Sequence, residues 1–229
     1  MNQALLIIAK RPASGQTKTR LCPPLSEQAA ATLYECFLQD MLNVARAVPN
    51  VTRFINYWPA EAEAYFRHLA PDFELLLQQG PRLGERLDNA LTHSLTHGFE
   101  RVVITNSDSP TLPAAYLAQA FDALAQADVV LGPCHDGGYY LIGLTRPQPR
   151  LLREVPMSTP TVLQDTLALA EGLRVKLLPT WFDVDTVEEL QRLAADLEVS
   201  QNGVDLHTKR FLAENLNFLR GSSIPSSRS

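Results

Sequence analysis

Short apolar runs alternate with longer amphipathic segments along most of this chain. The run Ala4–Ala9 is rich in Leu and Ile and is bounded by polar residues, which is typical of a strand buried on both faces of a parallel sheet. Later runs of the same kind predict further strands, at Val51–Trp58, Phe73–Leu77, Arg101–Thr105, Asp128–Gly132, Tyr139–Leu144 and Arg174–Leu178.

The segments between these runs predict helices, because several begin at capping residues and end at helix-stop residues. Ser26 is the expected N-cap of the first helix, which ends near Val48 because Pro49 follows. Gly98 and Gly172 are the expected stops of two others. The predicted helices are Ser26–Val48, Ala60–Leu69, Leu83–His97, Pro113–Ala127, Pro160–Glu171, Thr186–Leu197 and Leu206–Leu219.

Strands that alternate with helices predict an α/β fold with a mostly parallel sheet. We expect one domain over residues 1–200, followed by a C-terminal helix and a disordered Ser-rich tail within residues 201–229. In such sheets ligands bind beyond the carboxyl ends of the strands. Functional residues are therefore expected just after the predicted strands.

Composition narrows the class of protein. The chain has 229 residues, 45% of them hydrophobic, which is enough for a sizeable core without disulfides or structural metal. A disordered chain and a disulfide-stabilised miniprotein are therefore excluded. Twenty basic and 25 acidic residues give a net charge of −5. Such a chain has no overall attraction to phosphate backbones, so we expect no nucleic-acid partner.

The cysteines and the N-terminus bear on location. Cys22, Cys36 and Cys134 are odd in number and widely spaced, without a C-x-x-C pair. We expect reduced thiols in a cytoplasmic protein. The first apolar run is too short to cross a membrane and lacks the basic start and cleavage site of a signal peptide.

The first candidate site is the loop that follows the first strand, AKRPASGQTKTRL. It carries Lys10, Arg11, Lys18 and Arg20 around Gly15, a local reversal of sign in an acidic chain. Gly15 can turn backbone N–H groups inward, and the cations can hold phosphate oxygens. The spacing matches neither GxxxxGK[ST] nor GxGxxG. A solvated basic loop is the alternative, and the sequence leaves both open.

Two acidic segments follow other predicted strands. Asp108, in ITNSDSPTLP, is placed where a carboxylate could ligate Mg²⁺ or Mn²⁺. Asp183 and Asp185, in WFDVDT, lie two apart and point the same way in an extended chain. Asp108 and Asp185 could together hold a divalent cation and leave positions open for a diphosphate. The alternatives are an Asx turn at Asp108 and a helix cap at Asp185 or Thr186.

A glycine-containing turn, GPCHDGGYYLIGL, separates two apolar strands. Asp136, Gly137 and Gly138 either face a substrate or simply close a hairpin, for which Asp-Gly is a favoured type I′ pair. His135 is a candidate acid/base or substrate-binding group, and a role outside the site is its alternative.

The segment QQGPRLGERLDNAL leads into a helix. Gly80 and Gly84 allow close approach to the backbone, and Arg86 lies near the helix N-terminus, so a base or sugar could bind there. The alternative is a plain loop before an amphipathic helix. His93 and His97 have a spacing that can bind zinc, but no third ligand is evident and we expect no metal there.

Five segments taken together resemble, in chain order, the signature blocks of the DUF2064 proteins: AKRPASGQTKTRL, QGPRLGERL, ITNSDSPTLP, GPCHDGGYYLIGL and FDVDTVEEL. These are bacterial proteins similar to GT-A glycosyltransferases, and the resemblance spans about residues 3–197. The wider superfamily holds nucleotide-diphospho-sugar transferases and nucleotidylyltransferases, including guanylyltransferases of molybdenum-cofactor and coenzyme F420 precursors. The resemblance implies a Rossmann-like GT-A fold, a three-layer α/β/α sandwich around a mostly parallel sheet.

The resemblance also implies a nucleotide site. Lys18 and Arg20 would belong to the phosphate-binding loop, together with Lys10 and Gly15. Gly84 and Arg86 would lie near the base.

Metal and acceptor sites are implied in the same way. Asp108 and Asp185 would ligate a divalent cation, Mg²⁺ or Mn²⁺, with Asp183 beside them. Asp136 would face the acceptor or sugar, next to His135, Gly137 and Gly138.

Three departures from the family pattern bear on the reaction. The basic loop lacks the paired glycines of many nucleotidylyltransferases, His135 replaces the acid of an EDGG block, and Asp108 stands in SDS rather than in D-x-D. The leading prediction is a metal-dependent glycosyltransferase that uses a nucleotide-activated sugar and a small-molecule acceptor, with Asp108 and Asp136 as catalytic residues. The alternatives are a nucleotidylyltransferase, which couples an NTP to a phosphorylated acceptor and releases pyrophosphate, and a non-catalytic nucleotide-binding relative.

Overall fold

The computed structural model describes residues 2–199 and 206–215. These residues form two compact units: residues 2–11 with 41–183, and residues 12–40 with the described chain from 184 onward. The domain expected over residues 1–200 thus comprises parts of both units, and its behaviour as one domain stays a prediction. The expected disordered tail lies outside the described residues.

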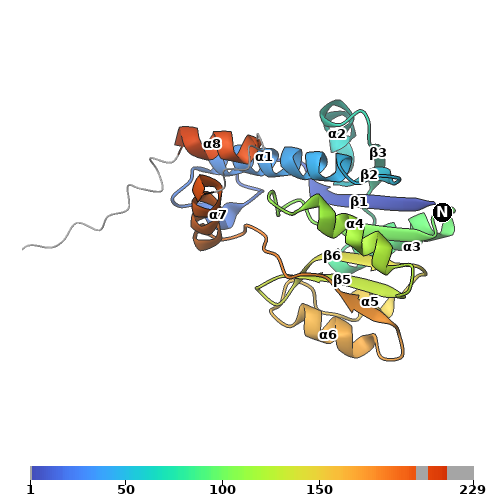
Figure 1. Cartoon of the computed structure of the whole chain (residues 1–229). Helices are drawn as coiled ribbons and strands as arrows, with labels where there is room; N and C mark the ends of the chain where they lie inside the picture. The colour runs from blue at the N-terminus through green and yellow to red at the C-terminus, as the bar shows by residue number, and fades with distance from the viewer. Residues whose placement is uncertain (1, 200–205, 216–229) are drawn as a thin grey trace, which may run out of the picture. The chain divides into compact units, whose positions relative to one another are not determined.

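A seven-stranded sheet is the core of the first unit, in the order β3-β2-β1-β4-β6-β5-β7 (Figure 1). Every neighbouring pair is parallel except those of β6, which runs antiparallel to both β4 and β5. The sheet confirms the predicted α/β class with a mostly parallel sheet. The strands are β1 (Gln3–Lys10), β2 (Thr52–Trp58), β3 (Glu74–Leu77), β4 (Arg101–Thr105), β5 (Val129–Pro133), β6 (Tyr139–Leu144) and β7 (Val175–Leu177).

The helices follow the predicted order, with two additions. The 3-10 helix η1 and the short helix α5 lie where no helix was expected, because three or four residues are too few to show helical periodicity. The expected helix Leu206–Leu219 is seen up to Asn215, and its remainder lies outside the described residues. The helices are η1 (Thr19–Leu21), α1 (Glu27–Arg46), η2 (Ala60–Ala62), α2 (Glu63–Leu69), α3 (Leu83–Thr96), α4 (Ala114–Ala123), α5 (Arg150–Arg153), α6 (Val162–Leu169), α7 (Val187–Val199) and α8 (His207–Asn215).

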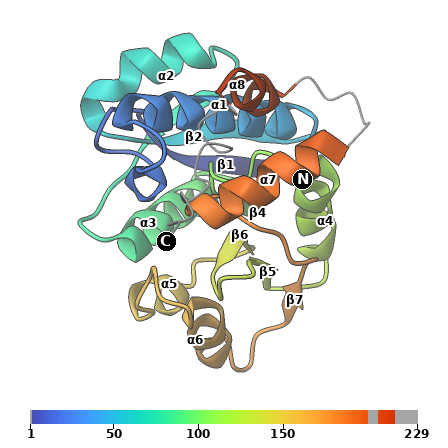
Figure 2. The ribbon, with the colours of Figure 1, turned by 90° about the vertical axis from the view of Figure 1, so that its left-hand side faces the viewer.

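Helices cover both faces of the sheet. On one face, Leu91 of α3 and Leu152 of α5 pack into a cluster with alternate strand residues such as Leu6 and Ile104. On the other face lies α4, which buries Leu117 and Phe121. Figure 2 shows α3 and α4 on opposite sides of the strands. Because strand side chains alternate between faces, the continuous apolar strands supply both interfaces of the predicted three-layer sandwich.

Side-chain caps begin two of the helices that the sequence predicted. Ser26 accepts the Ala29 N–H at 3.1 Å, which confirms it as the N-cap of α1. At α7, Thr186 accepts the Glu189 N–H at 3.3 Å while Glu189 Oε2 accepts the Thr186 N–H at 2.8 Å. This reciprocal capping box confirms the alternative role of Thr186.

In the second unit, the buried acid Asp40 of α1 is hydrogen-bonded to the start of α8. Asp40 is fully buried and its two carboxylate oxygens accept the N–H groups of His207 and Thr208, at 2.8 and 2.9 Å. These are donors that the start of α8 cannot satisfy within the helix. Asp40 therefore joins segments 167 residues apart in the sequence.

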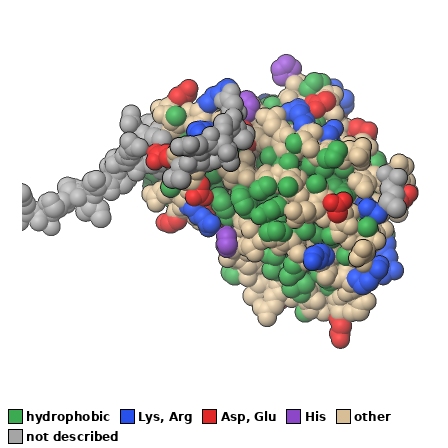
Figure 3. All heavy atoms as spheres, in the orientation of Figure 1, with side chains coloured by type: hydrophobic (Ala, Val, Ile, Leu, Met, Phe, Trp, Pro, Cys, Tyr) green, Lys and Arg blue, Asp and Glu red, His purple; other side chains and the backbone are tan. Residues whose placement is uncertain are grey.

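The surface agrees with the balanced composition. On the face drawn in Figure 3, Lys and Arg side chains are interspersed with Asp and Glu side chains. In the part of the chain that the structure describes, no helix has the length and hydrophobicity that a membrane crossing requires.

Candidate active site

Six of the seven strands point in the same direction, which brings their carboxyl ends to one edge of the sheet. These are β1, β2, β3, β4, β5 and β7. Ligands of open α/β sheets bind at this edge. The candidate residues of the first unit all follow these strands, and they fall into three groups at the ends of different strands.

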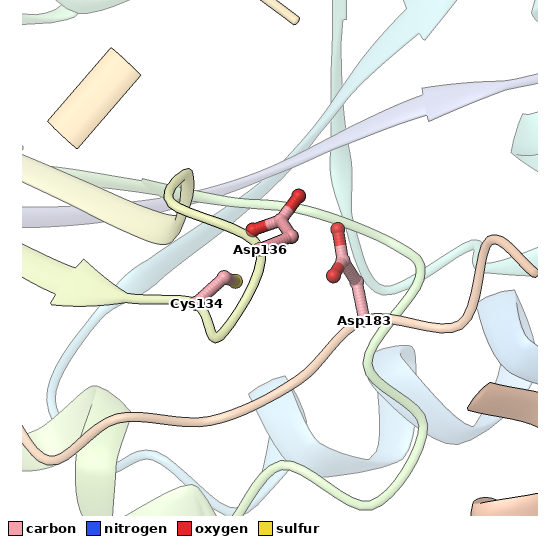
Figure 4. A group of neighbouring side chains, drawn as sticks. All are labelled: Cys134, Asp136 and Asp183. Atoms are coloured by element: carbon pink, nitrogen blue, oxygen red, sulfur yellow. The ribbon is translucent and has the colours of Figure 1, made fainter. Parts of the chain in front are cut away.

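The first group contains Cys134, Asp136 and Asp183, whose potential ligand atoms all lie within 4.8 Å of one another. Cys134 and Asp136 follow β5, and Asp183 follows β7 (Figure 4). Figure 4 shows the two carboxylates turned toward each other, with the sulfur beside them. Asp136 is exposed, Asp183 is half-buried and Cys134 is buried. Among the described residues, this is the one group of three or more potential metal ligands.

Backbone hydrogen bonds build this group from two strands. Cys134 bridges Trp181 in parallel fashion, and the Trp181 N–H donates to Pro133 O at 2.9 Å. The Cys134 N–H donates to Gly138 O at 2.9 Å and closes the turn. These bonds hold the segments after β5 and β7 side by side.

The glycine turn itself is fixed by packing. Gly137 has a φ of 91°, and a Cβ there would stand 1.8 Å from the carbonyl oxygen of Pro160, so only glycine fits. The Gly138 N–H donates to Asp136 Oδ1 at 2.9 Å, so the Asp136 side chain also caps its own turn. The segment closes a hairpin between β5 and β6, but the turn is not type I′, because Asp136 lacks the positive φ that this type requires. A substrate-facing role for Asp136, Gly137 and Gly138 stays a prediction.

The other residues of this hairpin have separate surroundings. His135 is exposed and does not join the ligand group. Tyr140 is buried, covers Gly132 and donates its hydroxyl to Pro179 O at 3.1 Å. Burial raises the pKa of Tyr139 to about 12. Tyr139 packs against the core cluster, so both tyrosines contribute to packing.

The second group surrounds Asp108, after β4. The Asp108 N–H donates to Asn106 Oδ1 at 3.4 Å, so the Asx turn here is made by Asn106. Ser107 and Ser109 on either side are buried, whereas Asp108 is half-buried. Asp108 is not part of the ligand group formed by Asp136 and Asp183. Its role as a metal ligand stays a prediction.

The third group lies at the ends of β1, β2 and β3. Lys10 is the register partner of Trp58. The Arg86 guanidinium stacks over the Trp58 ring, 4.4 Å from its centroid, and Arg86 Nε donates to Gly80 O at 2.8 Å. Close packing of α3 against α5 requires a glycine at position 84, because a Cβ there would stand 2.0 Å from Leu152 O in α5. The proximity of Gly84 and Arg86 to a base stays a prediction.

The basic loop beyond Arg11 belongs to the second unit, and there Lys18 forms an ion pair. Lys18 Nζ lies 2.6 Å from Asp185 Oδ1, and its side chain is 6% exposed while that of Asp185 is 42% exposed. The ammonium also stands near the rings of Tyr34 and Phe37 of α1. Lys18 is therefore not the solvated surface cation of the alternative interpretation.

The rest of this loop is more open. Gly15 adopts a φ of 69°, and both Gly15 and Arg20 are exposed. Phosphate binding by Gly15, Lys18 and Arg20 stays a prediction, as does metal binding by Asp185.

Sequence reasoning missed Cys134 and Trp58. Cys134 is one of three widely spaced cysteines without a C-x-x-C pair, and Trp58 lies in no motif. The position of each directly after or at the end of a strand was the signal that could have found them.

The rings of His93 and His97 are stacked, with their centroids 4.0 Å apart. Burial and the neighbouring His97 lower the pKa of His93.

Comparison with protein families and known proteins gives two kinds of relative. The profile of the family described as "Uncharacterized protein conserved in bacteria (DUF2064)" matches residues 41–159. The chain is 28% identical to 2-phospho-L-lactate guanylyltransferase of Methanothermobacter thermautotrophicus over 200 residues, which cover 85% of this chain and 83% of the relative. It is 28% identical to phosphoenolpyruvate guanylyltransferase of Chloroflexus aggregans over 186 residues, covering 78% and 91%.

Solved structures share the fold. The crystal structure of a "putative nucleotide-diphospho-sugar transferase" from Desulfovibrio desulfuricans G20 has a TM-score of 0.89 and 33% identity, covering 96% of this chain and 98% of that one. CMP:2-keto-3-deoxy-manno-octonic acid synthetase complexed with CTP has a TM-score of 0.58 and 11% identity, covering 86% and 99%. Rv0371c of Mycobacterium tuberculosis H37Rv, in complex with manganese, has a TM-score of 0.52 and 15% identity, covering 84% and 98%. The last two similarities establish the fold alone.

Proposed function

This chain belongs to the DUF2064 family, and from that premise we propose that it is a nucleotidylyltransferase. It would transfer a nucleoside monophosphate from an NTP to the phosphate of a small phosphorylated carboxylic acid and release pyrophosphate. Two guanylyltransferases, each similar over more than three quarters of this chain, support this reaction over the glycosyl transfer that led the sequence predictions. GTP is accordingly the first donor to test.

The observation that carries the proposal is the meeting of Asp136 and Asp183 at the carboxyl edge of the sheet. Two carboxylates at about 4 Å repel each other by about 1–4 kcal/mol at the effective dielectric constants of protein surfaces. A divalent cation between them removes this repulsion, and carboxylate oxygens are the ligands that Mg²⁺ and Mn²⁺ prefer. The donor set therefore fits such an ion, which Asp136 and Asp183 would hold and which, when bound, neutralises polyphosphate charge.

The reaction needs no general base from the protein. At neutral pH the acceptor phosphate is largely a dianion, because its second pKa is about 6. One of its oxygens forms a bond to the α-phosphorus of the NTP, and the bond from that phosphorus to the bridging oxygen of the β-phosphate breaks. Pyrophosphate leaves with the electron pair. The exposed His135 then has no proton to remove, and positioning of the two charged substrates becomes the main task of the site.

Cationic side chains would supply that positioning. In the first unit Lys10 ends β1, and Arg86 is held by its stack on Trp58 and its bond to Gly80. Both are proposed contacts of the nucleotide. Asp108 is a proposed further ligand of the cation.

Glycosyl transfer remains the second candidate because of one finding. The structure from Desulfovibrio desulfuricans G20, described as a sugar-nucleotide transferase, matches nearly the whole chain at higher identity than either guanylyltransferase. A nucleotide site and a divalent cation would serve both reactions, and only the leaving group differs.

The test is product analysis with purified protein. GTP, ATP, CTP and UTP are each incubated with Mn²⁺ or Mg²⁺ and with 2-phospho-L-lactate or phosphoenolpyruvate. Pyrophosphate release is measured by an assay coupled to inorganic pyrophosphatase. Release that requires an acceptor supports the proposal. Release of UDP or GDP from sugar nucleotides, with no pyrophosphate from any NTP, would overturn it and favour the second candidate.

A further inference from the structure

Cys134 is the member of the ligand group that neither the proposed chemistry nor the sequence motifs used. Its side chain is buried, 6% exposed, and points toward the same space as the two carboxylates (Figure 4). The protein has two other cysteines, Cys22 and Cys36, but neither belongs to a group of potential ligands in the described chain.

The position of the sulfur is set by the backbone on both sides. The Cys134 N–H donates to Gly138 O at 2.9 Å, and its carbonyl accepts the Gly137 N–H at 3.4 Å. The parallel bridge to Trp181 adds a third constraint. A side chain anchored in this way holds its position without the loss of entropy that a mobile ligand suffers on binding.

The distances suit one shared ion. Around a tetrahedral ion with bonds of about 2.0 Å to oxygen and 2.3 Å to sulfur, donor atoms stand about 3.3–3.5 Å apart. The three donor atoms already lie within 4.8 Å of one another. Small side-chain rotations close the difference, because Asp136 is exposed and Asp183 is half-buried.

Sulfur changes which ions the group favours. Mg²⁺ is bound by oxygen ligands and gains nothing from a thiolate. Zn²⁺, Co²⁺ and Cd²⁺ form strong bonds to thiolate, and Mn²⁺ binds most weakly of the first-row divalent ions. When such an ion binds, the thiol gives its proton to solvent and the sulfur donates an electron pair to the metal.

We infer that Cys134 is a sulfur ligand that makes the Asp136–Asp183 cation site select thiophilic divalent ions over Mg²⁺. The inference rests on the cation site of the proposed function, but it concerns the identity of the ion.

The test uses the metal alone. Full-length protein that has been stripped with a chelator is titrated with Co²⁺ and with Cd²⁺, and the thiolate-to-metal charge-transfer absorption is recorded. A Cys22→Ser/Cys36→Ser protein serves as the background, because its one remaining thiol is Cys134. We expect a saturable band with a stoichiometry of one. Cys134→Ser in this background removes the band and weakens Cd²⁺ binding by at least about tenfold, the effect typical of losing one tuned contact to a metal.

Comparing the affinities for Mg²⁺ and Cd²⁺ distinguishes the loss of a sulfur ligand from damage to the turn that carries Cys134. If Cys134 acts as a ligand, Cys134→Ser leaves the Mg²⁺ dissociation constant unchanged, and Asp183→Asn weakens both Mg²⁺ and Cd²⁺. Absence of the band in the background protein, or equal loss of Mg²⁺ and Cd²⁺ affinity in Cys134→Ser, would overturn the inference. Either result leaves pyrophosphate release as an independent test of the proposed function.

Discussion

Two acidic residues of the same short segment, Asp183 and Asp185, have different neighbours. Asp183 stands with another carboxylate, that of Asp136, and a thiol. Asp185 stands with an ammonium, that of Lys18, at 2.6 Å. One contact joins like charges and the other joins opposite charges, although both acids follow β7 within three residues of one another.

The difference indicates a structural role for one acid and a binding role for the other. An ion pair whose cation is largely buried contributes to the fold of its own unit, since removal of one partner leaves a desolvated charge. Two neighbouring carboxylates oppose folding slightly and are retained where a cation is to be bound. We therefore expect Asp183 to matter for activity and Asp185 to matter for stability, and the following experiments test that division.

The largest effect is expected on catalysis. Asp183→Asn removes one of two charges that would hold the cation, so kcat/KM for nucleotidyl transfer should fall about 10²–10³-fold, as for loss of a charge-stabilising group. The fall is measured by pyrophosphate release at saturating metal. Asp122→Asn on α4, an exposed acid outside the ligand group, is the matched control and should retain full activity. Equal activity in the two variants would refute the cation site.

The next largest effect is on stability. Asp185→Asn takes away the ion-pair partner of the nearly buried Lys18 ammonium. Removing a partner from a fully buried pair costs about 3–5 kcal/mol, and an exposed pair about 0–1. Asp185 is 42% exposed, so we expect an intermediate loss of about 1–3 kcal/mol in the free energy of unfolding, measured by urea denaturation.

A matched control for this loss is Glu63→Gln, which breaks an exposed pair with Arg67 on α2. That change should alter the free energy of unfolding by less than about 0.5 kcal/mol. The double variant Lys18→Met/Asp185→Asn should recover part of the loss, because it leaves no unmatched ammonium. If Asp185→Asn is as mild as Glu63→Gln, the ion pair has no stabilising role.

A smaller effect is expected on the stability that a bound ion confers. Mn²⁺ at ten times its dissociation constant should stabilise the native protein by about 1.4 kcal/mol, seen as a rise in Tm. Asp183→Asn should abolish this rise. Asp185→Asn should lower the starting Tm but keep the Mn²⁺-induced rise. Loss of the rise in Asp185→Asn would instead support the sequence prediction that Asp185 is a metal ligand.

The smallest effect concerns another ion pair, at the start of β5. Arg174 holds the pKa of Asp128 down from 3.8 to about 2. Since the folded-state pKa is depressed, this contribution to stability is present above pH 4 and is lost as the pH falls toward 2. Asp128→Asn should therefore lower stability at pH 6 and have a much smaller effect near pH 2, as followed by acid titration of the unfolding midpoint. An effect of equal size at both pH values would contradict this.

Much of the fold was predictable because its signals are local. The buried strands are short apolar runs, and β4 and β6 were predicted with their observed ends. Ser26 and Thr186 cap helices through bonds that span three residues, so residue type and position were sufficient. The additional helices η1 and α5 were missed because three or four residues are too few to show helical periodicity.

The candidate site was only partly predictable. The sequence placed acids after β4, β5 and β7, and the rule that parallel strands end at one edge brought them to the same side of the sheet. The sequence predicted Asp108, Asp183 and Asp185 as metal ligands, whereas the structure groups Asp183 with Asp136 and Cys134. The partner of Asp185 is Lys18, which is 167 residues away.

By itself, the sequence determined the type and order of the elements, the helix caps and the family, because each depends on residues near one another in the chain or on the order of motifs. Only the tertiary structure brings Asp136 to Asp183 and pairs Asp185 with Lys18. Gly137 and Gly84 carry the same lesson, since a carbonyl from a distant segment fills the space that a side chain would need. Contacts of this kind depend on how strands are ordered in a sheet and how turns are packed, and a local pattern holds no information about either.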